Sequence, residues 1–191
     1  GFGMQGGSDV AKEASDIVLT DDNFASVVKA VELGRTFMHN IMMFLEFQLP
    51  INISLLILSV IYPMIAAGAL LASVQILIVN IIMDSLNSLS FGGEPPKDEY
   101  MTEKPIKKGS GLFIRGAKKR IAISTVAFIV LYGIITFSPI ANMFATETEA
   151  ITARFALLCF MAVFNGFNIR TEHINLFNGI GKNKLFSAIA I

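Results

Sequence analysis

Long stretches without charged residues dominate the hydrophobic pattern of this chain. The longest runs from Phe47 to Met83 and contains no Asp, Glu, Lys, Arg or His. A membrane-spanning helix needs about 20 apolar residues, so this stretch is too long for one span and suits two. Proline and glycine interrupt helices. We therefore expect a turn between the two spans near Tyr62-Pro63 and Ala67-Gly68.

Three further apolar stretches follow the same pattern. Charge-free runs extend from Ile121 to Thr146 and from Phe155 to Ile169, and another begins at Leu185. They predict an all-α polytopic membrane protein with four transmembrane helices and the start of a fifth. The expected spans, with the first including its polar beginning, are 24–62, 71–91, 119–140 and 150–169, with the next starting at 185.

The first 23 residues are polar and differ from the rest. Gly1–Gly7 contains four glycines and predicts a flexible loop. Ser8 or Asp9 is suited to cap a short helix ending near Ser15, and Ile17–Leu19 predicts a brief buried strand. A small soluble α/β segment therefore precedes the membrane helices.

A long helix is expected to follow this segment. Phe24, Val27, Val31 and Phe37 recur at helical spacing, and no strong helix breaker occurs before Pro50. One helix that begins near residue 24 and enters the membrane is the simplest interpretation. The alternative is a separate surface helix with a linker at Gly34.

Charge and composition narrow the possible classes of protein. The chain has 191 residues, of which 53% are hydrophobic and 16% charged, and its formal net charge is zero. This composition is typical of a collapsed chain rather than a disordered one, and it gives no reason to expect a nucleic-acid partner. The single Cys159 excludes a disulfide framework and a cysteine-based zinc site.

Basic residues set the expected orientation. Lys and Arg concentrate in the loop 97–120 and again in 170–184, whereas the loops near 63–72 and 141–150 contain neither. Basic loops stay in the cytoplasm. We therefore expect a multi-pass protein whose N-terminus, basic loop and 170–184 loop are cytoplasmic.

Polar residues within the apolar runs are the candidates for a functional site. Asp84 lies at the end of the second span, and Asn80 precedes it by one helical turn; Asn52 lies deep in the first span, two residues after Pro50. An ionisable group inside a membrane is costly and commonly functional. Carboxylates, amides and free carbonyls are the ligands of a hard cation such as Ca²⁺. The alternative is that these groups only join helices by hydrogen bonds.

Several motifs resemble one family. The segment Asp9–Phe24 is similar to the end of the phosphorylation domain of P-type cation-transporting ATPases, most of all the plasma-membrane-type and bacterial Ca²⁺-transporting ATPases. The motifs at 34–35, 47–52, 79–84 and 93–96 continue the resemblance over essentially the whole chain. It implies that 1–23 is the C-terminal remnant of the cytoplasmic phosphorylation domain. Residues 24–191 would be the transmembrane domain, carrying the family's fifth to eighth helices and the start of the ninth.

The resemblance also assigns ion ligands. Asn80, Asp84 and Asn52 match the calcium ligands of the family's sixth and fifth helices, while Pro50 departs from the pattern. Pumps that carry two ions have further oxygen donors at three positions. These positions are Leu55, Met83 and Ala162 here, which implies a single ion site.

The function implied by the resemblance is ATP-driven export of Ca²⁺ across the plasma membrane through an aspartyl-phosphate cycle. The phosphorylated aspartate and the sites for ATP and Mg²⁺ would lie in other parts of the parent pump. The segment alone is expected to be inactive, and its partners would be the lipid bilayer and those remaining domains. The alternatives are a pump for another cation, such as Na⁺ or Mn²⁺, and a non-enzymatic channel-like or scaffolding membrane domain.

Overall fold

The computed structural model describes residues 1–66, 68–105, 113, 116–139, 143–170, 183, 184, 186 and 188. The chain divides into two compact units. The first comprises Gly1–His39 and Pro95–Ile106, and the second Asn40–Glu94 and Lys107–Ile191. A continuous fifth span starting at 185 lies outside the described residues, as do all three basic residues between 107 and 115.

The first unit begins with a small parallel sheet. Strand β1 (Phe2–Met4) pairs with strand β2 (Ile17–Leu19), and helix α1 (Asp9–Glu13) lies between them in the chain. The Ser8 hydroxyl accepts a hydrogen bond from the amide of Ala11 at 3.3 Å, which caps α1 as the sequence predicted. The predicted strand at Ile17–Leu19 is present, but its predicted burial is wrong for two of three residues, because only Leu19 is buried and Ile17 and Val18 are exposed.

The prediction of a loop throughout Gly1–Gly7 is wrong, because Phe2–Met4 forms β1. A three-residue strand is too short to show alternation, and its glycine suggested a turn. The structure explains the glycine differently. Gly3 is buried, and a Cβ there would come within 2.7 Å of the Ser15 hydroxyl. Gly3 therefore allows the strand and the residues after α1 to approach closely.

Helix α2 (Ala25–Ile65) contains 41 residues and runs through both units without a break. The Asn23 side chain accepts from the amide of Ala25 at 3.0 Å, which satisfies one of the free N–H groups at the helix start. The single long helix is thus confirmed, and the alternative with a linker at Gly34 is excluded. The helix also continues past Pro63, because a proline so near the end removes only one hydrogen bond from the last turns.

Helix α5 (Glu99–Thr102) belongs to the first unit and is held by the early part of α2. The Arg35 guanidinium donates to the carbonyls of Tyr100, Met101 and Glu103 at 2.5, 3.3 and 2.8 Å. The His39 ring stacks on the Tyr100 ring, with centroids 3.9 Å apart. Arg35 thereby supplies donors to the carbonyls at the C-terminal end of α5, where helices lack intrahelical partners.

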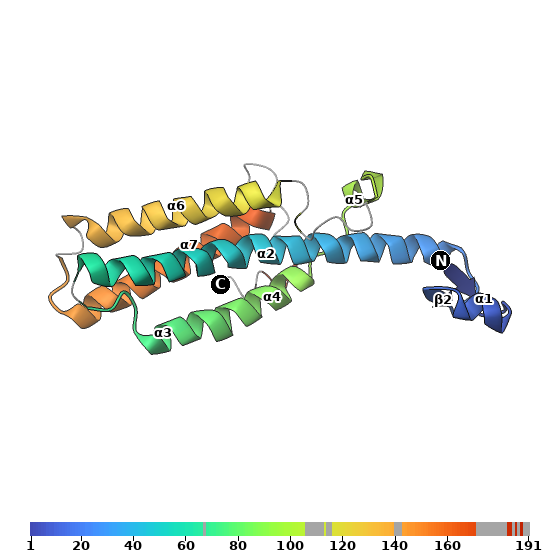
Figure 1. Ribbon diagram of the computed structural model, residues 1–191, viewed down its shortest axis with the longest axis horizontal. Coiled ribbons are helices and arrows are strands. Elements are labelled where there is room, and N and C mark those ends of the chain that lie inside the picture. Colours follow the sequence, from blue (N-terminus) through green and yellow to red (C-terminus); the bar gives the residue numbers. More distant parts are fainter. Residues whose placement is uncertain are drawn as a thin grey trace. The chain divides into compact units, whose positions relative to one another are not determined.

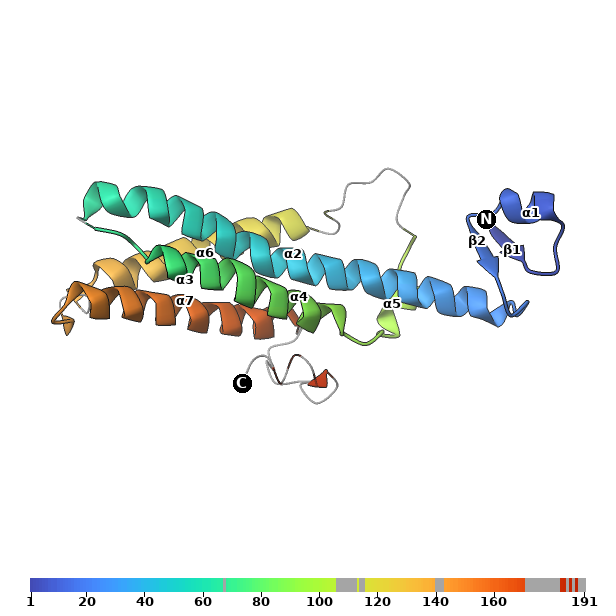
Figure 2. The same ribbon diagram turned by 90° about the horizontal axis from the view of Figure 1, so that it is seen from below.

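The second unit is a bundle of apolar helices (Figures 1 and 2). Its elements are the later part of α2, the consecutive helices α3 (Ser73–Ile78), η1 (Val79–Met83, a π-helical turn) and α4 (Asp84–Gly92), and helices α6 (Ala117–Phe137) and α7 (Glu147–Arg170). Among the described residues, four helical stretches are long and apolar enough to cross a membrane: Ala25–Ile65, Ser73–Gly92, Ala117–Phe137 and Glu147–Arg170. The predicted all-helical architecture with four such helices is confirmed.

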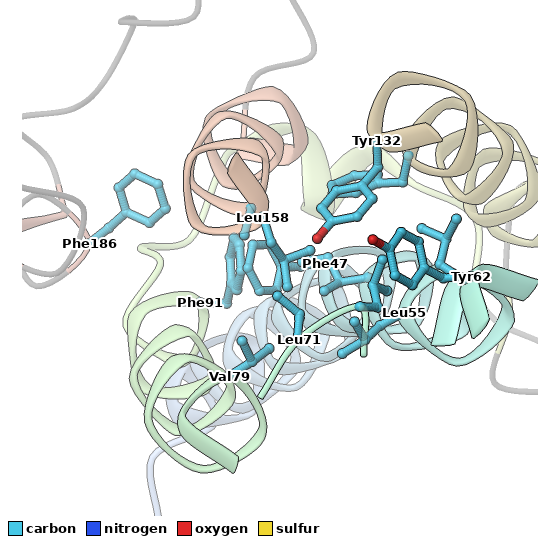
Figure 3. Packing of buried hydrophobic residues seen from close by; sticks show 14 residues of the cluster. Phe47, Leu55, Tyr62, Leu71, Val79, Phe91, Tyr132, Leu158 and Phe186 are labelled. Carbon is cyan, nitrogen blue, oxygen red and sulfur yellow. The ribbon is translucent and has the colours of Figure 1, made fainter. Parts of the chain in front are cut away.

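The core of the bundle lies along one face of α2. Phe47, Ile51, Leu55 and Leu58 recur at helical spacing and are all buried. Figure 3 shows side chains of the other helices converging on this face. The opposite side of the same helix is also apolar, and Met64 is 82% exposed. Helices that are apolar on every side are typical of membrane spans.

A buried ion pair joins the ends of α4 and α7. The Glu94 carboxylate accepts from the Arg170 guanidinium, and their side chains are only 8% and 6% exposed. Asn183 also donates to Glu94 Oε1 and to the Ser90 carbonyl, each at 2.9 Å. The charges are therefore both compensated and hydrogen-bonded, which a buried ion pair requires.

Breaking this pair should destabilise the bundle strongly. Replacing Arg170 with Gln leaves the Glu94 carboxylate buried without its countercharge, at a cost of about 3–5 kcal/mol. The double variant Glu94→Met/Arg170→Met should recover most of this loss, because no charge then remains buried. Thermal unfolding in detergent micelles measures both. A single variant as stable as the double variant would contradict the importance of the pair.

The start of α2 should depend on pH through Asp21. The pKa of Asp21 lies below its ordinary value because the carboxylate accepts from the Ser26 hydroxyl and the Asn23 amide. A lowered folded pKa stabilises the folded form above the unfolded pKa of about 3.9. The stabilisation is lost as pH falls through the still lower folded value. Asp21→Asn should therefore reduce amide-exchange protection of residues 25–29 at pH 7, and the difference should vanish near pH 2.

Candidate cation-binding site

Two amide side chains of α2 converge on one carboxylate of the facing helix. Gln48 Nε2 donates to Asp84 Oδ2 at 2.8 Å, and Asn52 Nδ2 donates to the same oxygen at 3.4 Å. Gln48 and Asn52 are four residues apart and so lie on one face of α2. Asp84 is only 9% exposed, within a bundle that is otherwise largely apolar. The geometry thus gathers a carboxylate and two amides at one place between two helices.

Asp84 is the first residue after the π-helical turn Val79–Met83. Such turns are rare and are found mostly at functional sites. The turn separates the two residues that sequence spacing had placed together, because Asp84 is buried whereas Asn80 is exposed. Within the described part of the chain, no hydrogen bond joins them. Of the three predicted ligands, the structure brings together Asn52 and Asp84 but not Asn80.

Pro50 lies inside α2, between the two amide-bearing residues. Its ring nitrogen cannot donate, so the carbonyl four residues earlier, at Glu46, loses its usual helical partner. The carbonyl of Pro50 itself is 2.5 Å from the Ser54 hydroxyl, which is also 3.2 Å from the carbonyl of Thr125 in α6. Pro50 lies two residues from each amide and so on the opposite side of α2, where Ser54 secures the helix to α6.

Sequence reasoning missed the contribution of Gln48. Gln48 belongs to the motif at 47–52, for which the sequence predicts a role of Asn52 but none of the Gln48 amide. The available signal was its spacing, since Gln48 precedes Asn52 by one helical turn within a stretch free of charge. Two amides on one face of a membrane helix favour a shared polar partner across the interface. That partner is Asp84.

The donor set fits a hard cation. Each amide now presents N–H groups to the carboxylate, and a half-turn about its terminal torsion would present its oxygen instead. Carboxylate, amide and carbonyl oxygens are the preferred ligands of Ca²⁺. Among the described residues, no cluster of three or more His, Cys, Asp or Glu side chains is suited to hold a metal. The arrangement therefore suits a site with one carboxylate and neutral oxygens.

The three apolar residues that the resemblance matched to oxygen donors of two-ion pumps contribute to the packing of the bundle. Leu55 and Ala162 are 6% and 0% exposed and belong to the hydrophobic core, and Met83 packs against that core. The space around them is filled by hydrocarbon and sulfur rather than by oxygen. These side chains add no further oxygen donor beside Asp84.

Comparison with known proteins identifies the family. Residues 68–191 match the family model described as "Cation transporting ATPase, C-terminus". The chain belongs to this family. The match includes η1, Asp84 and helices α4, α6 and α7, so the second of the two helices that form the site is part of the family's C-terminal membrane region.

Individual relatives extend the match to nearly the whole chain. The chain is 39% identical over 204 residues to plasma membrane calcium-transporting ATPase 1 of Homo sapiens, covering 100% of this chain and 17% of that protein. It is 35% identical over 192 residues to calcium-transporting ATPase 9, plasma membrane-type, of Arabidopsis thaliana, covering 96% and 18%. Plasma membrane calcium-transporting ATPase mca-1 of Caenorhabditis elegans is 37% identical over 202 residues. The chain spans less than a fifth of the length of these relatives.

Proposed function

We propose that this chain is the C-terminal membrane part of an ATP-driven pump that exports Ca²⁺, and that Asp84, Asn52 and Gln48 hold the transported ion. The observation that carries the proposal is the convergence of two α2 amides on the buried Asp84 carboxylate. The relatives named above are calcium pumps, which supports Ca²⁺ as the cargo.

The placement of a carboxylate here needs a functional reason. An ionisable side chain inside a membrane costs at least a few kcal/mol, and an amide in its place could join the two helices without that cost. A divalent cation bound at Asp84 would meet negative charge together with amide oxygens from α2. Ca²⁺ binds six to eight oxygens, so water and residues of the parent pump outside this chain complete the shell in this proposal.

Asn80 joins the site in this proposal through the π-helical turn. The turn holds one residue more than a regular helical turn, so rewinding it would rotate Asn80 relative to Asp84. We propose that the ion-bound form has Asn80 turned toward Asp84 and that the described form, with Asn80 exposed, corresponds to weaker binding. Two arrangements of one helix provide a pump with the two affinities that it needs.

The remaining steps belong to the parent pump. We propose that ATP and Mg²⁺ bind to its other domains, that an aspartate there is phosphorylated, and that residues 1–23 end this cytoplasmic phosphorylation domain. Residues 24–191 form the transmembrane domain in this proposal, with the N-terminus in the cytoplasm of a plasma membrane. Helix α2 would carry the movement, because it is continuous from Ala25 to the site at Asn52. The chain alone would be inactive.

The decisive variant is Asp84→Asn in the full-length pump. It preserves the shape of the side chain and its contacts with α2 but removes the charge, so Ca²⁺-dependent phosphorylation by ATP should require at least tenfold more Ca²⁺. Thr125→Val is the matched control, since the Thr125 hydroxyl bonds to its own helix at 2.8 Å. Unchanged Ca²⁺ affinity in Asp84→Asn would reject the ligand role. Activation of the unmodified pump by Na⁺ or Mn²⁺ instead of Ca²⁺ would reject the cargo.

Gln48 supplies a second test, because it distinguishes a ligand from a structural hydrogen bond. Gln48→Leu removes both the amide oxygen and the donor, and the loss of one good polar contact should weaken Ca²⁺ affinity about tenfold. Gln48→Glu retains an oxygen at the same reach and should bind Ca²⁺ more tightly than the leucine variant. Equal affinities of the two variants would limit Gln48 to a role in packing. The measurement is the Ca²⁺ dependence of phosphoenzyme formation.

A further inference from the structure

An arginine lies among aromatic side chains at the opposite end of the bundle from Arg170. The Arg154 guanidinium, on α7, donates to the Tyr62 hydroxyl of α2, and its central carbon is 4.8 Å from the centroid of the Tyr62 ring. The Tyr132 hydroxyl of α6 donates to the Arg154 carbonyl at 3.2 Å. Figure 3 shows the hydroxyls of Tyr62 and Tyr132 turned toward each other within the core. The side chain of Arg154 therefore contacts α2, while its backbone is bonded to α6, and the residue is partly buried.

The charge of Arg154 is not neutralised by a carboxylate. The two other arginines of the bundle each have one, since Arg120 pairs with Glu46 and Arg170 pairs with Glu94. Within the described ranges, no salt bridge reaches Arg154, and its Nε atom is buried without a hydrogen-bond partner.

Among the described contacts, neither acidic residue at the start of α7 pairs with Arg154. The Glu147 carboxylate lies against Gly68, so close that a Cβ on that glycine would overlap it. Glu149 accepts from the amides of Ala145 and Thr146 at 3.0 and 3.4 Å. The cation–π contact and one tyrosine hydroxyl stabilise the guanidinium, but its full positive charge remains.

The position of this charge relates it to the candidate ion site. Tyr62 follows Asn52 by ten residues of α2, which corresponds to about 15 Å along the helix. Tyr62 continues the same buried face as Ile51 and Leu55. By the orientation in the proposed function, Tyr62 and Arg154 lie toward the external side and Asp84 lies toward the cytoplasm. An ion leaving the site outward would therefore approach a fixed positive charge.

We infer that Arg154 lowers the affinity of the externally facing ion site and so opposes the rebinding of a released cation. This inference rests on the proposed function. Arg154 is not an ion ligand; it acts across the bundle through its field. At about 15 Å and an effective dielectric near 20, the repulsion between one positive charge and a divalent cation corresponds to at least a tenfold change in affinity. A neutral side chain could make the same hydrogen bond to Tyr62, so the bond alone does not explain the charge.

The test uses the full-length pump in proteoliposomes, oriented with the ATP-binding side outward. Ca²⁺ inside the vesicles then represents external Ca²⁺, and its inhibition of ATP turnover reports rebinding. Arg154→Gln should be inhibited at about tenfold lower internal Ca²⁺ than the unmodified pump. Arg154→Lys retains the charge and should behave as the unmodified pump does. Because the field acts on the bound ion whichever side it entered from, activation by Ca²⁺ on the ATP side should also occur at lower Ca²⁺ in Arg154→Gln, and it should be unchanged in Arg154→Lys.

Specific outcomes would overturn the inference. Unchanged internal inhibition in Arg154→Gln would remove the field effect, and an equal shift in Arg154→Lys would assign the effect to packing. Tyr62→Phe provides a second variant if the glutamine variant does not fold, because it removes the hydrogen bond and keeps both the ring and the charge. Its internal inhibition should change less than twofold, and a tenfold shift would contradict the proposal. If the unmodified pump transports no Ca²⁺, the proposed function fails first and is recognised separately.

Discussion

Gln48 and Asn52 both donate hydrogen bonds to one oxygen of Asp84. The arrangement of the helices in the second unit depends on this interaction. A carboxylate in an apolar bundle is tolerated only when polar groups surround it, and here two consecutive turns of α2 provide them. This requirement fixes the rotation of α2 about its axis. The hydrophobic face that packs against the other helices follows from the same rotation, because Phe47, Ile51 and Leu55 adjoin the two amides on that face.

The bundle distributes its charges unevenly. Near the ends of α4, α6 and α7 that adjoin the basic loops, acid and base occur in pairs, as in Glu46–Arg120 and Glu94–Arg170. Deeper in the bundle, the Asp84 carboxylate accepts from two amides, and farther along the Arg154 guanidinium donates to the Tyr62 hydroxyl. Paired charges hold helices together, whereas a single uncompensated charge creates a field that extends over many ångströms. The bundle thus contains charges that are neutralised in pairs and charges that are stabilised only by neutral polar or aromatic groups.

Much of this architecture could be predicted from the sequence. Charge-free stretches located the four long helices, and the absence of a breaker before Pro50 predicted α2 as one element. Asp84 and Asn52 were recognised because polar groups are conspicuous in such stretches. Strand β1 was missed, since three residues carry no periodicity. The exposure of Asn80 could not be foreseen, because spacing rules assume a regular α-helix and the π-helical turn violates that assumption. The surroundings of Arg154 depend on contacts between residues distant in sequence, which no local pattern contains.

Arg35 couples the early part of α2 to α5. Its guanidinium bonds to three carbonyls more than sixty positions downstream, those of Tyr100, Met101 and Glu103. The stacked His39 adds a second point of attachment one turn later in α2. Two points of contact on the same helix transmit a rotation of the helix as well as a translation. A rotation of this part of α2 about its own axis would therefore move α5 with it.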